Sequence, residues 1–543
     1  MKTEMYTINV ESPRRNLYWS TVGICLLILI RPFLVDTVPP LLDYAIHLSR
    51  AYIVDNHATD PFLNEIYDVD WRPIPNLASD ILLVPLLVVF DVDVAGRILL
   101  GLCVLSTVIG VLLLHRSTFG HRSWWPLLSV LPAYHGALSA GFINYSIGVA
   151  FLLFALSASV SLNIYRSIFS PAALLSLSLI VFFCHAITFG LFILFSFFFH
   201  LLKERSNDNC FRACFFDVAT VHFFPTVVPF LIYLYYSLYE VVARENHLLV
   251  GEWTLGSKVR GAIMPVLSGE IVLDILSLLF VVGLIVAAIF SPSRNVSRGL
   301  MVGSTIVLIM SIILPGHMID AAFISDRLTI PACLVMISSI NPVKINKNII
   351  ILSIFSTLTL IFLRSECLIK SWQDSSEYYT RITDAVQKIE SGSSVAISSP
   401  LTDIGGQSYI YWLELLFSSP SWHFALINIP TLHSLPVLAL TRRSTFSQLH
   451  FVWADKQILS LATSFQDLNF GDGGASTWSP GEVLEEHGDL TIKTSDYMNR
   501  FDYFLFVYVN HLGSDLLAKI ASLDPLYADD DIVLLKNQSA RPR

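Results

Sequence analysis

Long apolar runs constrain this chain more than any other feature of its sequence. Several of them approach the roughly 20 residues that a membrane-spanning helix needs. Charged residues make up only 14% of the 543 residues, against about 25% in soluble domains. The chain is therefore predicted to be a polytopic α-helical membrane protein, with apolar runs at residues 17–34, 95–114, 171–202, 215–238, 271–290, 300–314 and 349–363.

The positions of Lys and Arg in the short loops give an expected orientation. The run 171–202 is too long for one span and is predicted to turn near His185. A cytoplasmic N-terminus then places Lys or Arg in every cytoplasmic loop and leaves the C-terminal region outside. The eleven predicted spans cover 17–35, 95–114, 124–138, 142–162, the two halves of 171–202, 215–238, 271–290, 300–314, 328–340 and 349–363.

The predicted organisation is a helical bundle followed by a smaller outer domain. Residues 1–366 form the membrane domain, and its outer loop, 36–93, is predicted to hold juxtamembrane helices. Within that loop the apolar segment 77–90 is short and contains Asp80, so we expect it to lie at the membrane surface or to re-enter rather than to span. Charged residues return in 367–543, which is predicted to be an outer α/β domain. Strands are expected at 394–398, 424–429, 437–440, 503–509 and 531–535, and a helix at 376–389.

Composition also argues against several classes of protein. The net charge is −9 and no basic stripe occurs, so nucleic acid is not an expected partner. The seven cysteines lie mostly in or beside apolar segments, which disfavours a disulfide framework. No Cys/His spacing typical of a metal site and no GxSxG motif occurs.

The first candidate site lies in PPLLDYAIHLSR, residues 39–50, directly after the first apolar run. The two prolines end one helix, and a new helix can begin after them. Asp43 and His47 are then i and i+4 on one face, and His47 and Arg50 are i and i+3. By themselves these residues favour a surface helix in which Asp43 caps the start and pairs with Arg50. Polar groups beside a membrane are also typical of functional sites.

Further candidates lie in the same outer loop and at later turns of the chain. Arg72, Asn76 and Asp80 form a polar cluster in which an arginine fork could hold a phosphate, or in which a turn carries an interfacial tryptophan. His185 either bonds within the bundle or contacts a lipid headgroup. Arg327 either pairs with Asp326 or binds a phosphate.

Residues 17–122 resemble the GT-C class of membrane glycosyltransferases, which includes protein O-mannosyltransferases and lipid A aminoarabinose transferases. Asp43 stands where these enzymes have an early acidic residue in the first outer loop. The stretch 72–75 (RPIP) resembles a basic and proline-rich element of that loop. Residues 90–99 resemble the start of the second span, and 115–120 resemble its inner end. The arrangement of the motifs DY…HLSRA and W…PNLASD also resembles the arrangement in bacterial membrane proteins of unassigned activity.

Two positions depart from the pattern of the class. The usual adjacent Asp-Glu pair is replaced by Asp43-Tyr44, and a lysine of the middle hairpin is absent, with His185 near its place.

The resemblance implies an enzyme of the bacterial inner membrane that takes a sugar from a lipid-phosphate-linked donor on the extracytoplasmic side. The acceptor would be a glycan, a lipid or a protein. Asp43 would act as the general base, with His47 and Arg50 in support. Arg72, Arg327 and His185 would stabilise the leaving phosphate, and Asn76 and Asp80 would serve the acceptor or the loop. Some members of the class use a divalent metal, and no ligand spacing here argues for one.

Two other functions stay open at this point. A transporter or flippase of a lipid-linked saccharide would show a repeated half-structure with interrupted helices at mid-membrane, and no internal repeat occurs in the sequence. A non-catalytic membrane assembly protein would use the outer domain to bind a partner, although a bundle of this size exceeds what an anchor requires.

Overall fold

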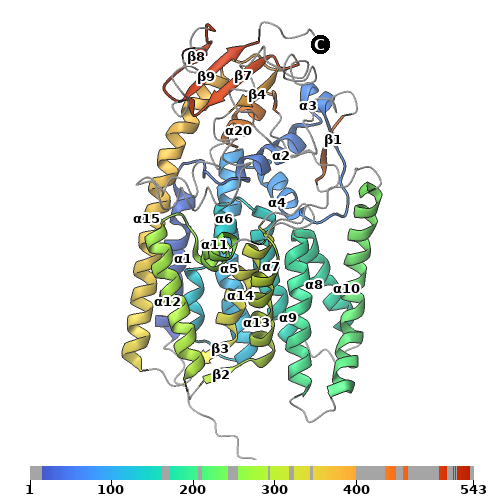
Figure 1. Ribbon diagram of the computed structural model, residues 1–543, viewed down its shortest axis with the longest axis vertical. Helices are drawn as coiled ribbons and strands as arrows, with labels where there is room; N and C mark the ends of the chain where they lie inside the picture. The colour runs from blue at the N-terminus through green and yellow to red at the C-terminus, as the bar shows by residue number, and fades with distance from the viewer. Residues whose placement is uncertain are drawn as a thin grey trace, which may run out of the picture.

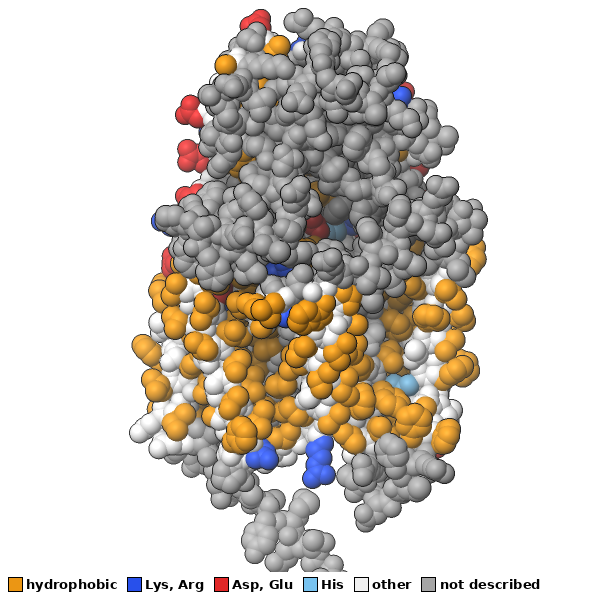
Figure 2. Space-filling model, viewed as in Figure 1, with side chains coloured by type: hydrophobic (Ala, Val, Ile, Leu, Met, Phe, Trp, Pro, Cys, Tyr) orange, Lys and Arg blue, Asp and Glu red, His pale blue; other side chains and the backbone are white. Residues whose placement is uncertain are grey.

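The computed structural model places a bundle of apolar helices below a smaller layered region that contains a β-sheet (Figure 1). It describes residues 15–161, 170–205, 211–241, 253, 255–291, 294–316, 323–342, 346–398, 434–447, 457–462, 500–509, 518, 520 and 523–537. Around the bundle the side chains form a broad apolar band, and basic side chains stand at its lower edge (Figure 2). This distribution is the one expected of a protein that crosses a bilayer.

Seven helices within the described residues are long and apolar enough to span a membrane. Shorter apolar helices are α4 (Ala78–Leu87), α8 (Ser170–Cys184) and α13 (Arg298–Ile313). The seven long helices are α1 (Arg15–Leu34), α5 (Val92–Phe119), α7 (Ile143–Ser161), α9 (Ala186–Arg205), α10 (Phe211–Val241), α12 (Ile271–Phe290) and α15 (Lys347–Val386). The chain is therefore an integral multi-pass membrane protein.

The eleven expected spans are confirmed only in part. Seven coincide with the long helices, and α8 and α13 are the shorter apolar helices at two further positions. The span expected at 328–340 is α14 (Ile324–Ser338), which has 15 residues. The predicted turn at His185 is confirmed, because α8 ends at Cys184 and α9 begins at Ala186.

The prediction of a membrane-spanning helix at 124–138 is wrong. The chain there forms a short 3-10 helix, η1 (Trp125–Val130), and one helical turn, α6 (Gly136–Ser139). Pro126 and Pro132 remove backbone donors that a continuous helix would use. Every residue from 125 to 138 is buried, so protein rather than lipid surrounds this irregular backbone.

Arg364, on α15, supplies hydrogen bonds that the irregular segment lacks. Its guanidinium is fully buried and donates to the carbonyl oxygens of Leu131 (2.6 Å) and Tyr134 (2.9 Å). It also donates to the carbonyl of Val266 (2.5 Å), and its charge lies 3.4 Å from the buried Asp274 carboxylate. Because unpaired carbonyls in an apolar interior are costly, this arginine stabilises the bend, and sequence reasoning did not single it out.

Short elements form a layer on one end of the bundle. They are α2 (Tyr44–Asn56), α3 (Pro61–Ile66), β1 (Tyr67–Val69) and α4, followed later in the chain by α11 (Leu255–Ile263) and η2 (Met264–Val266). The helix α4 has 10 residues and lies within this layer (Figure 1), and its juxtamembrane position stays a prediction. At the opposite end, β2 (Arg294–Val296) pairs antiparallel with β3 (Ile340–Pro342).

A mixed five-stranded sheet forms the core of the C-terminal region. Its order is β5-β4-β7-β9-β8, with β4 parallel to β5 and β7, and β9 antiparallel to β7 and β8. The strands expected at 394–398, 503–509 and 531–535 are confirmed. The expected strand at 424–429 lies outside the described residues. The strands are β4 (Ser394–Ser398), β5 (Phe446–Ser447), β7 (Tyr503–Val507), β8 (Tyr527–Ala528) and β9 (Ile532–Lys536).

The strand expected at 437–440 is wrong. Residues 435–442 form the helix α20 (Leu435–Arg442), which begins with Pro436 in its first turn. A proline at that position fits a helix start, because its missing N–H would have no partner there. All residues from Leu435 to Thr441 are buried, so the short run shows no amphipathic period that would separate helix from strand.

The C-terminal region and the outer layer are joined by direct contacts. The strand β1 pairs antiparallel with β6 (Leu459–Leu461). Arg442 lies 2.6 Å from Asp91 and 2.7 Å from Asp93, at the start of α5. The boundary expected at 366–367 falls inside α15, so a continuous helix rather than a flexible linker connects the two regions.

Candidate functional site

The start of α2 is fixed against the turn before α7. The backbone N–H of Asp43 donates to the carbonyl of Ala140 (3.2 Å). Gly141 has φ +73°, and a Cβ placed there would lie 2.6 Å from the Asp43 nitrogen. Only glycine allows this approach and this backbone conformation together. The position of Asp43 therefore depends on a residue that lies about a hundred positions further along the chain.

The Asp43 carboxylate accepts no hydrogen bond from the residues that the structure describes. Burial raises the pKa of Asp43 to about 7, although the nearby Arg327 and Arg50 act in the opposite direction. A carboxylate near neutrality can both take up and release a proton at physiological pH. The structure thus places a carboxylate with a raised pKa at the N-cap position of α2.

The surface-helix interpretation expects Arg50 to pair with Asp43. The structure shows no such pair. Its guanidinium forms a two-point ion pair with Asp80 of α4, with both N–O distances at 2.8 Å. Both side chains are 1% exposed. The same guanidinium also donates to Ser79 Oγ (3.1 Å) and to Gln457 Oε1, which belongs to the C-terminal region. Arg50 and Asp80 therefore hold α2, α4 and the C-terminal region together.

His47 belongs to this network. Its Nδ1 lies 3.2 Å from Nη2 of Arg50, so Nδ1 accepts and the ring proton is on Nε2. Burial and, second, the charge of Arg50 hold the pKa of His47 well below its usual range. His47 is therefore neutral at physiological pH.

Asn144, on α7, is a site residue that sequence reasoning did not single out. Its Oδ1 accepts from the backbone N–H of Ser79 (2.7 Å), which fixes the first turn of α4. The side chain is 4% exposed, and its Nδ2 has no partner among the described residues. An asparagine within an apolar helix gives a sequence signal that could have led to it.

Arg327 does not pair with Asp326. Asp326 accepts from Nε (2.8 Å) and Nη2 (2.5 Å) of Arg260 on α11 instead. The Arg327 guanidinium lies over the Phe142 ring, 3.8 Å from its centroid, and its buried Nε has no hydrogen-bond partner among the described residues. Its positive charge lowers the pKa of Asp43 through electrostatic attraction, without a hydrogen bond between the two side chains.

His185 faces Arg327 as a second donor. The backbone N–H of Ile187 donates to Nδ1 of His185 (3.1 Å), so the proton of the neutral ring is on Nε2. That Nε2 lies 3.3 Å from Nη1 of Arg327. Both atoms are donors, and neither satisfies the other. An anion placed between them would accept from both, which is the arrangement that a phosphate oxygen requires.

The remaining predicted residues lie in the loop between β1 and α4. Arg72 pairs with Asp70 (3.1 Å), and Asn76 has φ +67°, a conformation that asparagine tolerates better than most residues. Their roles toward phosphate and acceptor stay predictions.

The described residues do not fit a metal site made of protein ligands alone. No three His, Cys, Asp or Glu side chains of the described ranges come together closely enough to hold an ion.

A recess opens just above the apolar band, and acidic, histidine and basic side chains are visible in it (Figure 2). Together with the contacts above, it defines a multi-pass membrane protein with a polar site at the end of the bundle that carries the C-terminal sheet.

Comparisons with known proteins show likeness at the level of solved structures alone. No protein-family model matches the chain, and no curated protein matches it. Among solved structures, the chain is similar to ArnT from Cupriavidus metallidurans in the apo state, with a TM-score of 0.43 and 9% sequence identity over 97% of this chain and 99% of that chain.

Proposed function

We propose that this protein is a membrane glycosyltransferase that moves a sugar from a lipid-phosphate-linked donor to an acceptor hydroxyl at the end of the bundle that carries the C-terminal region. This end is the extracytoplasmic one in the expected orientation. The observation that carries the proposal is the pairing of a base with an anion site. The Asp43 carboxylate lies within electrostatic reach of Arg327, while Arg327 and His185 present donors that do not satisfy one another.

Asp43 acts as the general base on the acceptor. Its carboxylate has no hydrogen-bond partner among the described residues, so it can accept from an incoming hydroxyl. With a pKa of about 7 it is ionised in a large fraction of molecules at neutral pH. A positioned general base contributes about 10²- to 10⁴-fold to the rate of such a reaction.

Arg327 and His185 stabilise the leaving group. As the acceptor oxygen bonds to the anomeric carbon, the bond from that carbon to the phosphate oxygen breaks, and its electron pair stays on the phosphate. The guanidinium and the Nε2–H of His185 then donate to the phosphate oxygen. The acceptor proton passes to Asp43. Donors fixed before the reaction are effective because they need no reorganisation as the charge develops.

The test uses purified full-length protein in vesicles made from a bacterial envelope extract, which supplies lipid, glycan and protein hydroxyls as acceptors, together with polyprenyl phosphates that carry single pentoses or hexoses. Release of free polyprenyl phosphate is followed by mass spectrometry. We expect release with at least one donor, and a loss of about 10²-fold or more in Asp43→Asn. Asp68→Asn, an exposed carboxylate in the same outer layer, is the matched control and should retain the rate.

Thermal unfolding accompanies the assay, so that loss of fold is distinguished from loss of catalysis. Release by Asp43→Asn at the wild-type rate would remove Asp43 as the base. Absence of release with every donor would contradict the transferase assignment itself and favour transport or assembly.

A further inference from the structure

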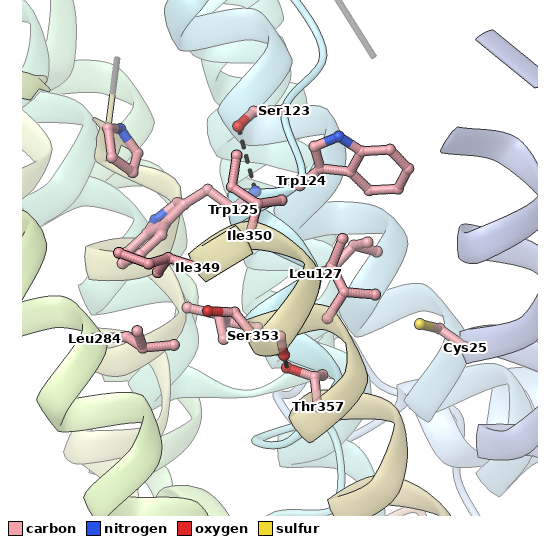
Figure 3. A pocket seen from close by; sticks show the side chains of 13 residues that line it. Cys25, Ser123, Trp124, Trp125, Leu127, Leu284, Ile349, Ile350, Ser353 and Thr357 are labelled. Atoms are coloured by element: carbon pink, nitrogen blue, oxygen red, sulfur yellow. Dashed lines mark hydrogen bonds between the residues drawn. The ribbon is translucent and has the colours of Figure 1, made fainter. Parts of the chain in front are cut away.

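A groove at the opposite end of the bundle from the candidate site carries an independent proposal. It lies between α12 and α15, with η1 as its floor (Figure 3). Ile349, Ser353 and Thr357 follow one face of α15, with Leu284 on one side and Cys25 on the other. The other lining residues are Ser123, Trp124, Trp125, Leu127, Leu128, Pro342, Ile350 and Ile354.

The helices that flank this groove present their outer faces to the hydrocarbon of a bilayer, and Ile349, which lines the groove, is itself 50% exposed. On α15 the side chains of Ile351, Leu352 and Phe355 are 64–66% exposed, and on α12 Leu279 is 64% exposed. Two of the polar groups that line the groove already have partners: Thr357 Oγ1 donates to the Ser353 carbonyl (2.8 Å), and the Trp125 indole donates to the Ile337 carbonyl (2.9 Å). Water has few partners here, whereas an apolar chain would make dispersion contacts along both walls.

The length of the groove suits a single leaflet. From Ile349 to Thr357 the helix α15 rises about 12 Å at 1.5 Å per residue. Half of the hydrocarbon core of a bilayer is about 15 Å thick. The groove begins beside the end of the apolar helices, where α1 and α15 start and α5 ends. An acyl chain of one leaflet could therefore lie along its whole depth.

Two guanidinium groups stand near the open end. Arg122 lies over the Trp19 ring (5.2 Å), and no carboxylate of the described residues pairs with Arg116 or Arg122. Both charges act on the Tyr18 hydroxyl, and the Tyr18 ring contacts Trp124, which lines the groove, at 5.3 Å. An anionic headgroup at this level would gain from both arginines, and Trp19 and Trp124 are typical interfacial residues.

We propose that this groove is a binding site for one anionic phospholipid, with an acyl chain along α15 and the phosphate at Arg122 and Arg116. The site is separate from the proposed transfer chemistry and does not depend on it.

The test measures lipid retention by native mass spectrometry of the full-length protein. The protein is delipidated and then exposed to phosphatidylglycerol and phosphatidylcholine with identical acyl chains. We expect one retained phosphatidylglycerol per chain and a preference of about tenfold or more over phosphatidylcholine. Arg122→Gln should abolish the preference, and Ser353→Phe, which fills the groove with an apolar side chain, should remove the retained lipid.

Arg298→Gln is the matched control, because this exposed arginine lies at the same end of the bundle but outside the groove. It should leave both the retention and the preference unchanged. Equal affinity of the wild type for the two lipids, or an equal effect of Arg298→Gln and Arg122→Gln, would overturn the proposal. Retention of polyprenyl phosphate in place of phosphatidylglycerol, when both are offered, would overturn it as well. Thermal unfolding of each variant shows whether lost retention reflects lost fold.

Discussion

At the scale of single residues, the protonation of two side chains defines what this site can do. Asp43 is a half-buried carboxyl group whose pKa is raised because its removal from water disfavours the charged form. His185 is fixed as the Nε2–H tautomer by a backbone N–H, so it can donate but cannot accept toward Arg327. The proposed base, Asp43, and the proposed phosphate donors, Arg327 and His185, thus differ in charge and in hydrogen-bonding role.

The pH dependence of transfer follows from Asp43. Only the ionised carboxylate can take the acceptor proton, and its pKa is about 7. The rate should therefore rise with pH, from about a tenth of its maximum one unit below the pKa to a plateau above it. Release of polyprenyl phosphate measured between pH 5 and 9 tests this. A flat profile, or a rise centred near pH 4, would show that a different group limits the reaction.

Gly141 provides a test of position rather than charge. A Cβ at this residue would lie 2.6 Å from the Asp43 nitrogen and would require an unfavourable φ of +73°. We expect Gly141→Ala to displace the start of α2 and to lower transfer by about tenfold or more, since small misplacements of catalytic groups are costly. Gly120→Ala is the control: φ is +77° there too, but a Cβ would meet open space. A similar loss of activity in both variants would point to backbone strain alone.

At the scale of elements, a buried polar network joins three parts of the chain. Arg50 on α2 contacts Asp80 on α4 and Gln457 of the C-terminal region, and Asn144 on α7 holds the backbone of Ser79. These bonds orient α2 above the bundle. The site is therefore built from helix ends and a loop that are fixed by side chains from distant parts of the sequence.

Breaking the Arg50–Asp80 pair should be more harmful than replacing it. Arg50→Ala leaves the Asp80 carboxylate buried without its cation, so we expect a loss of about 3–5 kcal/mol in the free energy of unfolding. The double variant Arg50→Met with Asp80→Leu removes both charges and should lose less. Thermal unfolding in detergent measures both. A double variant as unstable as Arg50→Ala would mean that the bonds to Ser79 and Gln457 dominate.

Sequence patterns predicted some elements well and others poorly. The break at His185 was predictable because a run of more than 30 apolar residues exceeds the thickness of a bilayer. The strand expected at 437–440 was wrong, since four apolar residues carry too little periodicity to separate helix from strand. The segment 124–138 has the composition of a span, but its prolines and the carbonyl contacts from Arg364 produce a bent, buried path instead.

At the scale of the whole molecule, the two ends of the bundle differ in chemistry. The outer layer and the sheet lie at one end, and basic side chains stand below the apolar band at the other (Figure 2). Because basic loops favour the cytoplasm, we expect the candidate site to face outward.

Accessibility labelling tests this orientation. In intact cells a membrane-impermeant maleimide should react with Glu65→Cys, at an exposed position of α3, and not with Arg298→Cys at the start of α13. Both should react after the membrane is permeabilised. The unsubstituted protein gives the background from its own cysteines. The reverse pattern would place the site in the cytoplasm.

The sequence by itself determined that this is a multi-pass membrane protein with a separate C-terminal region, and it led to Asp43, His185 and Arg327. The membrane class was predictable because hydrophobicity is a local property, and the three residues were chosen as candidates because a polar or charged group beside an apolar run is costly. The partners of these residues were decided by the tertiary structure. Arg50 pairs with Asp80, and Gln457, more than 400 residues further along the chain, accepts a hydrogen bond from Arg50. Arg260 pairs with Asp326. Arg327 therefore lies beside His185 instead. Such pairings depend on which buried charges packing brings within about 3 Å, and helical spacing carries no information on contacts between distant segments.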